Sequence, residues 1–445
     1  MKSIPAKYLF IYPIHYIRGE YISKAIKEAE LVNRLPLNEI IKYQKMKLLD
    51  VLFNASVNKT DCYNDVRRCY KYMQDNKRID IYSIFSEIPL MRKNNIREEF
   101  SIKRVDAYST LDSRSTSGST GVPFHFFKDR TATANMDATM YSAYKWHGVD
   151  LGAPQARFWG MPTHNKDKII AILKDILKNR IRFSAFNLET NAKICFYKKM
   201  GNFNPIYIYG YPSLINDYCD FLKNDSLDVK SLPIKVVIGT GEYVYEKERV
   251  NIQETFGVPF ISEYGCTEVG VIGFECEEGK MHVMSSNIYL EILKNGSRVV
   301  DEEGDIVVTE LHAKYNPFIR YCVGDRGILS HDRCTCGREL PVLTILSGRT
   351  DGYVITADGR KIYDAIFAYT LKNGIKQFKA IQNNINSIDI YVVIDNKYNY
   401  HVENSYKTEL HKIFGESMAI NIFKVDSIPK DKSGKLRYFE RRFNL

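Results

Sequence analysis

The chain has 445 residues, of which 44% are apolar and 26% charged, and its formal net charge is +10. This length exceeds one ordinary domain and the composition is that of a globular protein, so we expect two domains and exclude a disordered or fibrous chain. The charge alone would suit nucleic acid, but the Lys and Arg residues are scattered, apart from a modest cluster at Arg437, Arg441 and Arg442. We therefore expect a solvated basic surface and no nucleic-acid partner.

Residues 8–17 form an apolar run after two lysines, as a signal peptide would. Pro13, His15 and Arg18 interrupt the run and no small-residue cleavage site follows, so we expect a core segment instead. No other run is long enough to span a bilayer. The nine cysteines are an odd number without a repeating framework, which favours reduced thiols and a cytoplasmic protein.

Residues 1–100 predict a helical packing scaffold, because apolar residues recur there at spacings of three and four. The expected helices lie over residues 21–33, 37–51, 60–74 and 91–100. The last of them leads to a segment rich in serine, threonine and glycine.

That segment, residues 115–123, reads Ser-Thr-Ser-Gly-Ser-Thr-Gly-Val-Pro. Glycines let backbone N–H groups approach an oxyanion closely, and the hydroxyls add donors, so the pattern suits a loop that binds a polyphosphate. It is not the Walker loop, because no Lys follows the last Gly, and it lacks the glycine spacing of the dinucleotide fingerprint. A flexible linker is the alternative that this segment alone leaves open.

Short β-branched or aromatic runs follow the loop and alternate with helical patterns. They predict buried strands over 123–127, 157–160, 205–210, 235–240 and 258–262, with amphipathic helices over 131–146 and 166–179. Strands that end in Gly-rich turns before helices place ligands at the C-terminal edge of an open α/β sheet. Residues 304–346 predict a smaller β-rich unit, and residues 353–425 predict a small α+β domain.

Four later stretches stand in a fixed order, namely Tyr-Gly-Cys-Thr-Glu at 264–268 and the segments 319–325, 347–351 and 429–435. Together with the loop they resemble the adenylate-forming enzymes, which include acyl-CoA synthetases, peptide-synthetase adenylation domains and luciferases. Within that superfamily the chain is most similar to the phenylacetate–CoA ligase branch with its CapK-like proteins. The resemblance covers nearly the whole chain. It implies a large α/β N-terminal adenylation domain with a β-rich subdomain over 1–348, and a small mobile α+β lid domain over 349–445.

The resemblance implies an ATP site with phosphate contacts from the loop and from the 264–268 stretch. The loop residues that would hold the pyrophosphate part are Thr116, Ser117, Gly118, Ser119, Thr120 and Gly121. Thr267 would contact the α-phosphate. Glu268 would bind Mg²⁺, a hard ion that prefers carboxylate oxygen.

The same resemblance implies contacts to the nucleoside. Tyr264 would stack on adenine, and Gly241 and Glu242 would line the adenine side. Asp325 would accept hydrogen bonds from both ribose hydroxyls, a task that suits an ionised carboxylate. Arg349 would stand near ribose and phosphate.

Lys435 would reach from the small domain to the reacting carboxylate and the α-phosphate, where it would neutralise the charge that builds up. The alternative is that it belongs to a solvated C-terminal run with Lys430 and Lys432. Asp351 falls where relatives have a hinge, whose rotation would exchange Lys435 for a thiol tunnel.

The chain departs from the family pattern at three positions. Val122 replaces the usual Lys after the loop, Val323 replaces a Thr before Gly324, and Gly352 replaces the second Asp of the hinge. None of these changes removes a group with an assigned role. The family's acyl pocket is walled by the helix over 131–146, which makes Trp146 and His147 pocket candidates, with simple packing as the alternative.

Cys276, His282, Cys334 and Cys336 predict a second site. Two thiolates from a Cys-x-Cys turn, a third Cys and a His match a tetrahedral structural zinc site with no open position. Members of the resembled branch are similar in carrying such a site. Unrelated free thiols are the alternative.

We therefore expect an ATP-dependent carboxylate ligase that forms an acyl-adenylate, releases pyrophosphate and passes the acyl group to CoA. A sugar amine, another amino group or a carrier-protein thiol is the alternative acceptor, and a non-catalytic nucleotide- or zinc-binding module is the alternative of another class. The sequence identifies neither the carboxylic acid nor the oligomeric state, for which a homodimer is one arrangement.

Overall fold

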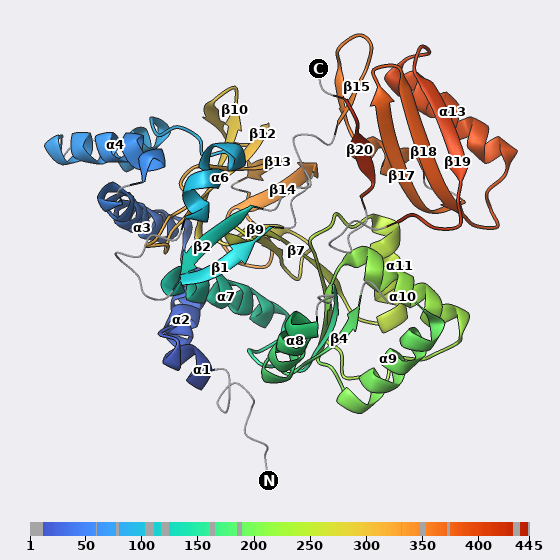
Figure 1. Cartoon of the computed structure of the whole chain (residues 1–445), viewed down its shortest axis with the longest axis horizontal. Coiled ribbons are helices and arrows are strands. Elements are labelled where there is room, and N and C mark those ends of the chain that lie inside the picture. The colour runs from blue at the N-terminus through green and yellow to red at the C-terminus, as the bar shows by residue number, and fades with distance from the viewer. Residues whose placement is uncertain are drawn as a thin grey trace. The chain divides into compact units, whose positions relative to one another are not determined.

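The structure is a computed structural model of the full chain (Figure 1). It describes residues 12–58, 60–76, 80–102, 111–116, 124–160, 165–184, 189–330, 332–347, 353–371, 374–429 and 437–443. The chain divides into two compact units, Met1–Val323 with Ile328–Thr344, and Gly324–Gly327 with Ile345–Leu445. The predicted domain boundary between 348 and 349 lies outside the described residues and stays a prediction.

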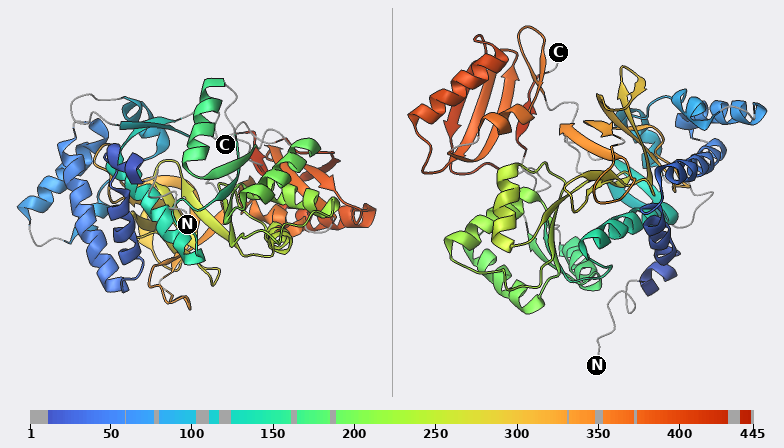
Figure 2. Two further views of the ribbon diagram at one scale, coloured as in Figure 1. Left: turned by 90° about the horizontal axis from the view of Figure 1, so that it is seen from below. Right: turned by 180° about the vertical axis from the view of Figure 1, so that it is seen from behind.

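The N-terminal part of the first unit is helical, as predicted. Its α-helices are α1 (Tyr12–Ile17), α2 (Ile22–Val32), α3 (Leu37–Val57), α4 (Asn64–Asp75), α5 (Ile81–Ser86) and α6 (Lys93–Ser101). Each of α2, α3 and α6 buries one apolar stripe, because its apolar residues recur at helical spacing. In both views of Figure 2 these blue helices lie together, away from the yellow-green helices of residues 190–256.

The expectation of a core segment at residues 8–17 is wrong for the part that the structure describes. Helix α1 has no buried residue, and Ile17 is 82% exposed. Tyr12 packs, partly buried, against the core, but the helix ends before Gly19, whose φ is +72°, and Tyr16 and Ile17 stay exposed. Residues 8–11 lie outside the described part.

A sheet of 12 strands forms the centre of the first unit, in the order β11-β10-β12-β13-β14-β9-β8-β7-β6-β5-β3-β4. Its parallel part consists of β3 (Gln155–Trp159), β4 (Arg180–Ser184), β5 (Tyr207–Gly210), β6 (Val236–Thr240) and β7 (Phe260–Cys266). From β7 onwards the pairing turns antiparallel. The other strands of the sheet are β8 (Gly270–Glu275), β9 (Met281–Val283), β10 (Ile288–Lys294), β11 (Ser297–Val299), β12 (Glu303–Glu310), β13 (Tyr321–Ser330) and β14 (Val342–Ser347). The strands predicted over 157–160, 205–210, 235–240 and 258–262 are thus confirmed in this sheet, and the β-rich part predicted over 304–346 continues the same sheet instead of forming a unit of its own.

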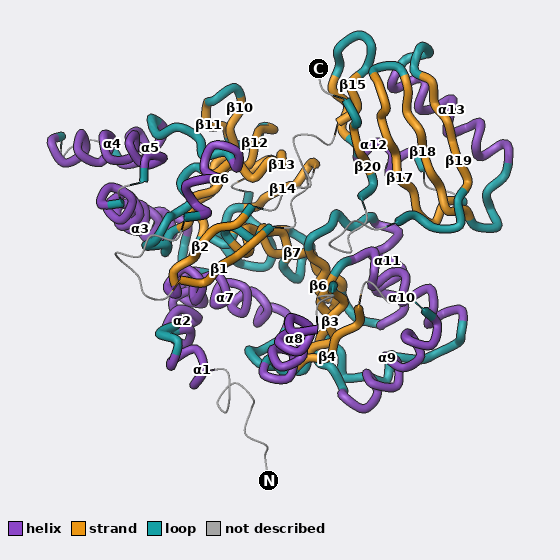
Figure 3. Tube along the Cα trace, in the orientation of Figure 1, coloured by secondary structure: helices purple, strands orange, loops and turns teal. Residues whose placement is uncertain are grey.

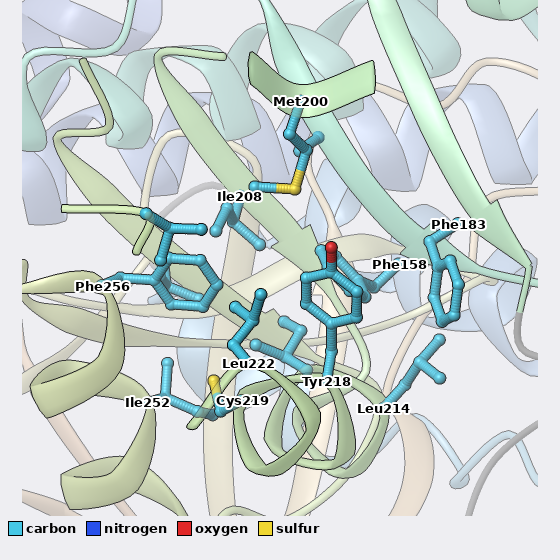
Figure 4. Packing of buried hydrophobic residues seen from close by; sticks show 14 of the residues in the cluster. Phe158, Phe183, Met200, Ile208, Leu214, Tyr218, Cys219, Leu222, Ile252 and Phe256 are labelled. Atoms are coloured by element: carbon cyan, nitrogen blue, oxygen red, sulfur yellow. The ribbon is translucent and has the colours of Figure 1, made fainter. Parts of the chain in front are cut away.

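Helices cover both faces of the parallel strands, as such strands require. On one face α9 (Thr190–Phe203), α10 (Pro212–Asn224) and α11 (Glu246–Phe256) enclose a core around Phe158, Tyr218 and Phe256 (Figures 3 and 4). On the other face α2 and α7 (Arg130–Tyr144) pack Ile26 and Tyr144 against the sheet. The remaining helix of this region, α8 (Asn165–Leu177), connects β3 to β4.

A hairpin of β1 (Leu111–Ser115) and β2 (His125–Asp129) frames the Ser/Gly-rich segment. The strand predicted over 123–127 therefore starts and ends two residues later, because antiparallel pairing with β1 extends to Asp129. Where β2 ends, the Asp129 carboxylate caps α7 by accepting from Ala132 N, and it accepts from the backbone N–H groups of Lys314 and Tyr315. The hairpin is thus fixed to the sheet region at one end.

The second unit has the predicted α+β character. A four-stranded sheet, β19-β18-β17-β20, is formed by β17 (Ile375–Asn384), β18 (Ser387–Ile394), β19 (Ala419–Lys424) and β20 (Phe439–Arg441). The other elements are β15 (Tyr353–Ile355), β16 (Lys361–Tyr363), α12 (Ala365–Thr370) and α13 (Tyr400–Phe414). Phe367 of α12 contacts Phe414 and Phe439, which closes a small core. No helix in the described part of the chain is long and apolar enough to cross a membrane.

Candidate active site

The C-terminal ends of β5, β6 and β7 meet at one edge of the sheet, because Gly210 pairs with Gly239 and Thr240 pairs with Glu263. A Cβ on Gly239 would come within 2.1 Å of the Phe260 ring, so glycine leaves the room that this ring occupies between β6 and β7. Four predicted site residues follow these strand ends, namely Gly241, Glu242, Thr267 and Glu268. A fifth, Tyr264, lies within β7 near its end. The fold thus brings them to the edge where open α/β sheets bind ligands.

Glu268 occupies the turn between β7 and β8 and is buried. Gly265 lets the two strands approach, because a Cβ there would lie 2.3 Å from the Gly270 carbonyl oxygen. Glu268 Oε1 accepts a hydrogen bond from the Tyr321 hydroxyl at 3.0 Å. Burial, together with the Glu268 carboxylate, raises the pKa of Tyr321, so this phenol stays protonated and donates.

Lys93, the first residue of α6, joins the β1–β2 hairpin to this carboxylate. Its Nζ lies 2.9 Å from Thr116 Oγ1 and 3.6 Å from Glu268 Oε1. Thr116 is itself buried, and its backbone N–H donates to the Phe124 carbonyl at 3.0 Å across the neck of the loop. Lys93, Thr116, Glu268 and Tyr321 form what we call the Lys93 cluster.

Backbone pairing explains how Lys93 reaches this position. Met91 forms an isolated bridge with Tyr321, in which Met91 N donates to the Arg320 carbonyl at 3.0 Å and Cys322 N donates to the Met91 carbonyl at 2.9 Å. Arg320 is buried, with Nη1 donating to the carbonyls of Ser86 and Ile88 at 2.7 Å each. The start of α6 is therefore fixed beside β13.

The buried residue Glu263 holds β7 in place close to the same edge of the sheet. The Glu263 carboxylate accepts from the Tyr144 hydroxyl at 2.7 Å and from the Tyr209 hydroxyl at 3.0 Å. Burial raises the pKa of Glu263, and the two phenol donors oppose that rise. Because Glu263 precedes Tyr264 in β7, this network fixes the strand just before the predicted adenine contact.

Glu242 has a structural contact of its own. Its Oε2 accepts from Ser213 N at 3.0 Å, which ties the turn after β6 to the start of α10. Gly241 has φ +79°, a left-handed backbone that favours glycine. Asp325 lies half-buried in β13. The roles of Gly241, Glu242 and Asp325 towards a nucleotide remain predictions.

Several predicted site residues lie outside the described part of the chain. They are Ser117, Gly118, Ser119, Thr120, Gly121, Arg349, Asp351 and Lys435. Sequence reasoning missed Lys93 and Glu263 and gave Tyr321 no role. Tyr321 stands in the 319–325 stretch, which was a signal, whereas nothing in the sequence around Lys93 indicates its partners.

The structure brings the four predicted zinc ligands together. One ligand atom from each of Cys276, His282, Cys334 and Cys336 lies within 4.8 Å of all the others. The Sγ atoms of Cys276 and Cys334 are 3.7 Å apart, and Cys336 Sγ lies 3.3 Å from His282 Nε2. The other ring nitrogen, Nδ1, lies 2.9 Å from the Leu340 carbonyl and donates to it, which leaves Nε2 for a metal. Three sulfurs and one imidazole fit tetrahedral zinc.

Trp146 packs against this cysteine and histidine cluster. Its ring centroid lies 6.1 Å from that of His282, and the Arg338 guanidinium lies 4.2 Å above the Trp146 ring. Arg338 in turn donates to both carboxylate oxygens of Glu277 at 2.7 and 3.0 Å. These contacts agree with the packing alternative for Trp146, and its place in an acyl pocket stays a prediction.

Comparison with known proteins agrees with this arrangement. The family model described as CapK C-terminal domain matches residues 354–442. Protein CapK of Staphylococcus aureus is 21% identical over 416 residues, which cover 90% of this chain and 89% of CapK. Phenylacetate-coenzyme A ligase of Thermus thermophilus is 26% identical over 162 residues, which cover 35% of this chain and 36% of that ligase.

Solved structures show the same fold. The crystal structure of 2-hydroxyisobutyryl-CoA ligase in the postadenylation state, in complex with R3-HIB-AMP, has a TM-score of 0.72 and 18% identity. The match covers 92% of this chain and 90% of that ligase. The predicted resemblance is therefore confirmed, and the chain is similar in sequence to the CapK-like branch over most of its length and has the fold of the adenylate-forming enzymes.

Proposed function

We propose that the protein is an ATP-dependent carboxylate ligase that forms an acyl-adenylate with release of pyrophosphate and then transfers the acyl group. The observation that carries this proposal is the Lys93 cluster, in which a buried carboxylate, a lysine and the first loop hydroxyl meet at the C-terminal edge of the sheet. The similarity to the fold of 2-hydroxyisobutyryl-CoA ligase supports it.

The chemistry needs two anions, a carboxylate and the α-phosphate, to meet in a fixed geometry. Lys93 Nζ would offer its charge to the polyphosphate, alongside the Thr116 hydroxyl and the N–H groups of residues 117–121. Glu268 supplies a hard oxygen ligand of the kind that Mg²⁺ takes beside substrate phosphates, and the residues present fit that ion. When bound, Mg²⁺ would neutralise phosphate charge.

The remaining predicted residues complete the proposal. Tyr264 would stack on adenine, Asp325 would hold the ribose hydroxyls, and Thr267 would contact the α-phosphate. Arg349 would stand near ribose and phosphate. Asp351 would act as the hinge for the transfer step.

Lys435→Ala is expected to lower ATP–pyrophosphate exchange by ~10²–10³-fold, because it removes a positive charge aimed at the reacting α-phosphate. Exchange should be measured with aromatic, aliphatic, amino and sugar acids in turn, since the carboxylic acid substrate is not identified. Lys432→Ala, a change in the same segment, is the matched control and should leave exchange unchanged. Full exchange by Lys435→Ala would reject the assigned role of Lys435, and no exchange with any acid by the parent protein would argue against the proposed adenylation.

CoA is the proposed acceptor, with a sugar amine, another amino group or a carrier-protein thiol as the alternative. CoA is the acceptor in the name of the Thermus thermophilus relative, while the name Protein CapK specifies none. Product analysis with the active acid, ATP and each acceptor separately would decide between them.

We also propose that Cys276, His282, Cys334 and Cys336 hold a structural Zn²⁺. Cys334→Ser with Cys336→Ser is expected to abolish zinc content and lower the melting temperature by ~5 °C or more, because metal binding contributes to folding stability. Metal analysis should use protein purified without chelator. Cys195→Ser alters an exposed free cysteine and should keep both zinc and stability. Parent protein without zinc would contradict the site.

A further inference from the structure

Helix α8 (Asn165–Leu177) carries its apolar residues on the outside. Ile169, Ile170, Ile172, Leu173, Ile176 and Leu177 are all between 40% and 68% exposed. Their spacing of one, three, four, seven and eight residues places all six side chains on one continuous face of the helix. Such a face normally turns towards the core, and here it does not.

The opposite side of α8 is the one that faces the protein, beside β4 (Figure 1). Its buried residues are Ala171 and Asp175. Both Arg180 and Arg182 bond to the Asp175 carboxylate, and Arg182 donates from Nε at 2.9 Å and from Nη2 at 2.8 Å. Arg182 Nη1 also donates to the Gly160 carbonyl at 2.6 Å. The side of α8 that carries Asp175 therefore faces the protein, and the apolar face on the opposite side is exposed.

The charged side chains that the structure describes beside the apolar face are positive. Lys168 and Lys174 are exposed and lie about 40° beyond its two edges, by the helical repeat of 100° per residue. Asp175, the other charged residue of α8 whose side chain the structure describes, is buried and paired with the two arginines. An apolar face bordered by lysines on both sides suits an anionic lipid surface, where the lysines reach the headgroups and the Ile and Leu side chains enter the acyl boundary.

We propose that α8 binds this protein to the surface of an anionic membrane, lying in the plane of the lipid headgroups. The helix has 13 residues, too few to span a bilayer, which agrees with an interfacial position. A second copy of the chain is disfavoured as the occupant, because docking α8 against α8 would bring Lys168 and Lys174 near the same lysines of the other copy. This proposal is independent of the proposed ligase activity.

Vesicle sedimentation of the full chain tests the proposal. The chain should sediment with vesicles of phosphatidylcholine and phosphatidylglycerol and far less with phosphatidylcholine alone. Ile169→Ser, Leu173→Ser and Ile176→Ser together should lower the partition coefficient by about 100-fold, because each removes apolar area from the membrane contact. Since these side chains are exposed, the melting temperature should stay at that of the parent.

Met46→Ser, Leu49→Ser and Phe53→Ser form the matched control, because these three residues are exposed at helical spacing on α3. This control variant should bind vesicles like the parent. Lys168→Gln with Lys174→Gln should lower binding to the anionic vesicles by about 30-fold and leave binding to phosphatidylcholine unchanged.

Three results would overturn the proposal. They are no binding to anionic vesicles, equal losses in the α8 and α3 variants, and a parent dimer that the triple α8 substitution converts to a monomer without vesicle binding. The last result, seen by analytical ultracentrifugation, would make the face a subunit interface instead.

Discussion

Lys93→Met is expected to lower kcat/KM for ATP in pyrophosphate exchange by ~10²-fold, and to weaken ATP binding measured calorimetrically without any acid. The reason is geometric. Lys93 Nζ lies 2.9 Å from the first loop hydroxyl, Thr116 Oγ1, and 3.6 Å from Glu268 Oε1, so one cation serves both the phosphate loop and the proposed Mg²⁺ ligand. Methionine keeps the chain length and removes the charge. Lys93→Arg should recover part of the loss.

The control for this prediction is Lys45→Met, which breaks an exposed pair with Asp80 at 2.7 Å and should leave both readouts unchanged. Glu268→Gln alone and combined with Lys93→Met would show whether the two residues act together, since coupled residues give non-additive losses. Parent-like ATP binding by Lys93→Met would remove Lys93 from the site.

Lys128→Met is expected to destabilise the first unit by ~3–5 kcal/mol, because it leaves the buried carboxylate of Glu310 without its cation. Lys128 of β2 is completely buried, and its Nζ pairs with Glu310 of β12. Burial lowers the pKa of Lys128 and raises that of Glu310, and the pairing opposes both shifts. Glu310 Oε2 also accepts from Phe318 N at 3.1 Å, so the pair ties the β1–β2 hairpin to the sheet.

Urea unfolding of the single and double variants would measure this loss. Lys128→Met with Glu310→Leu should be more stable than Lys128→Met alone, because no unpaired charge remains. Lys294→Met breaks an exposed pair with Glu302 and should change stability by less than ~1 kcal/mol. Equal losses from the buried and exposed changes would show that burial of the pair does not matter.

Much of the fold could be predicted from local patterns. The helices expected over 21–33, 37–51, 60–74 and 91–100 correspond to α2, α3, α4 and α6. The β-branched run at 235–240 became the buried strand β6, because a continuous apolar run fits a sheet covered on both faces. Residues 12–17 were predicted wrongly, since apolar composition alone does not reveal that a short helix ends before it can be covered.

In the candidate site, too, some residues were predicted from the sequence and others were not. The order of the motifs predicted Glu268 and Thr116 as site residues, and residue type and spacing predicted the four residues of the cysteine and histidine cluster. The partners of those groups could not be identified. Lys93 is 23 residues from Thr116 and reaches it only because Met91 bridges to Tyr321.

By itself the sequence determined most of the segments that are helices or strands and indicated which side chains have the chemistry to bind phosphate or metal, since both depend on residue type and spacing. Only the tertiary structure decided which of these side chains contact one another and which helix faces stay exposed. Tyr321 lies 53 residues from Glu268, and Cys336 lies 54 residues from His282. The amphipathic pattern at 166–179 likewise left the direction of its apolar face open. That direction was decided by the bonds of Asp175 to Arg180 and Arg182, because periodicity defines a face but not the surface that it meets.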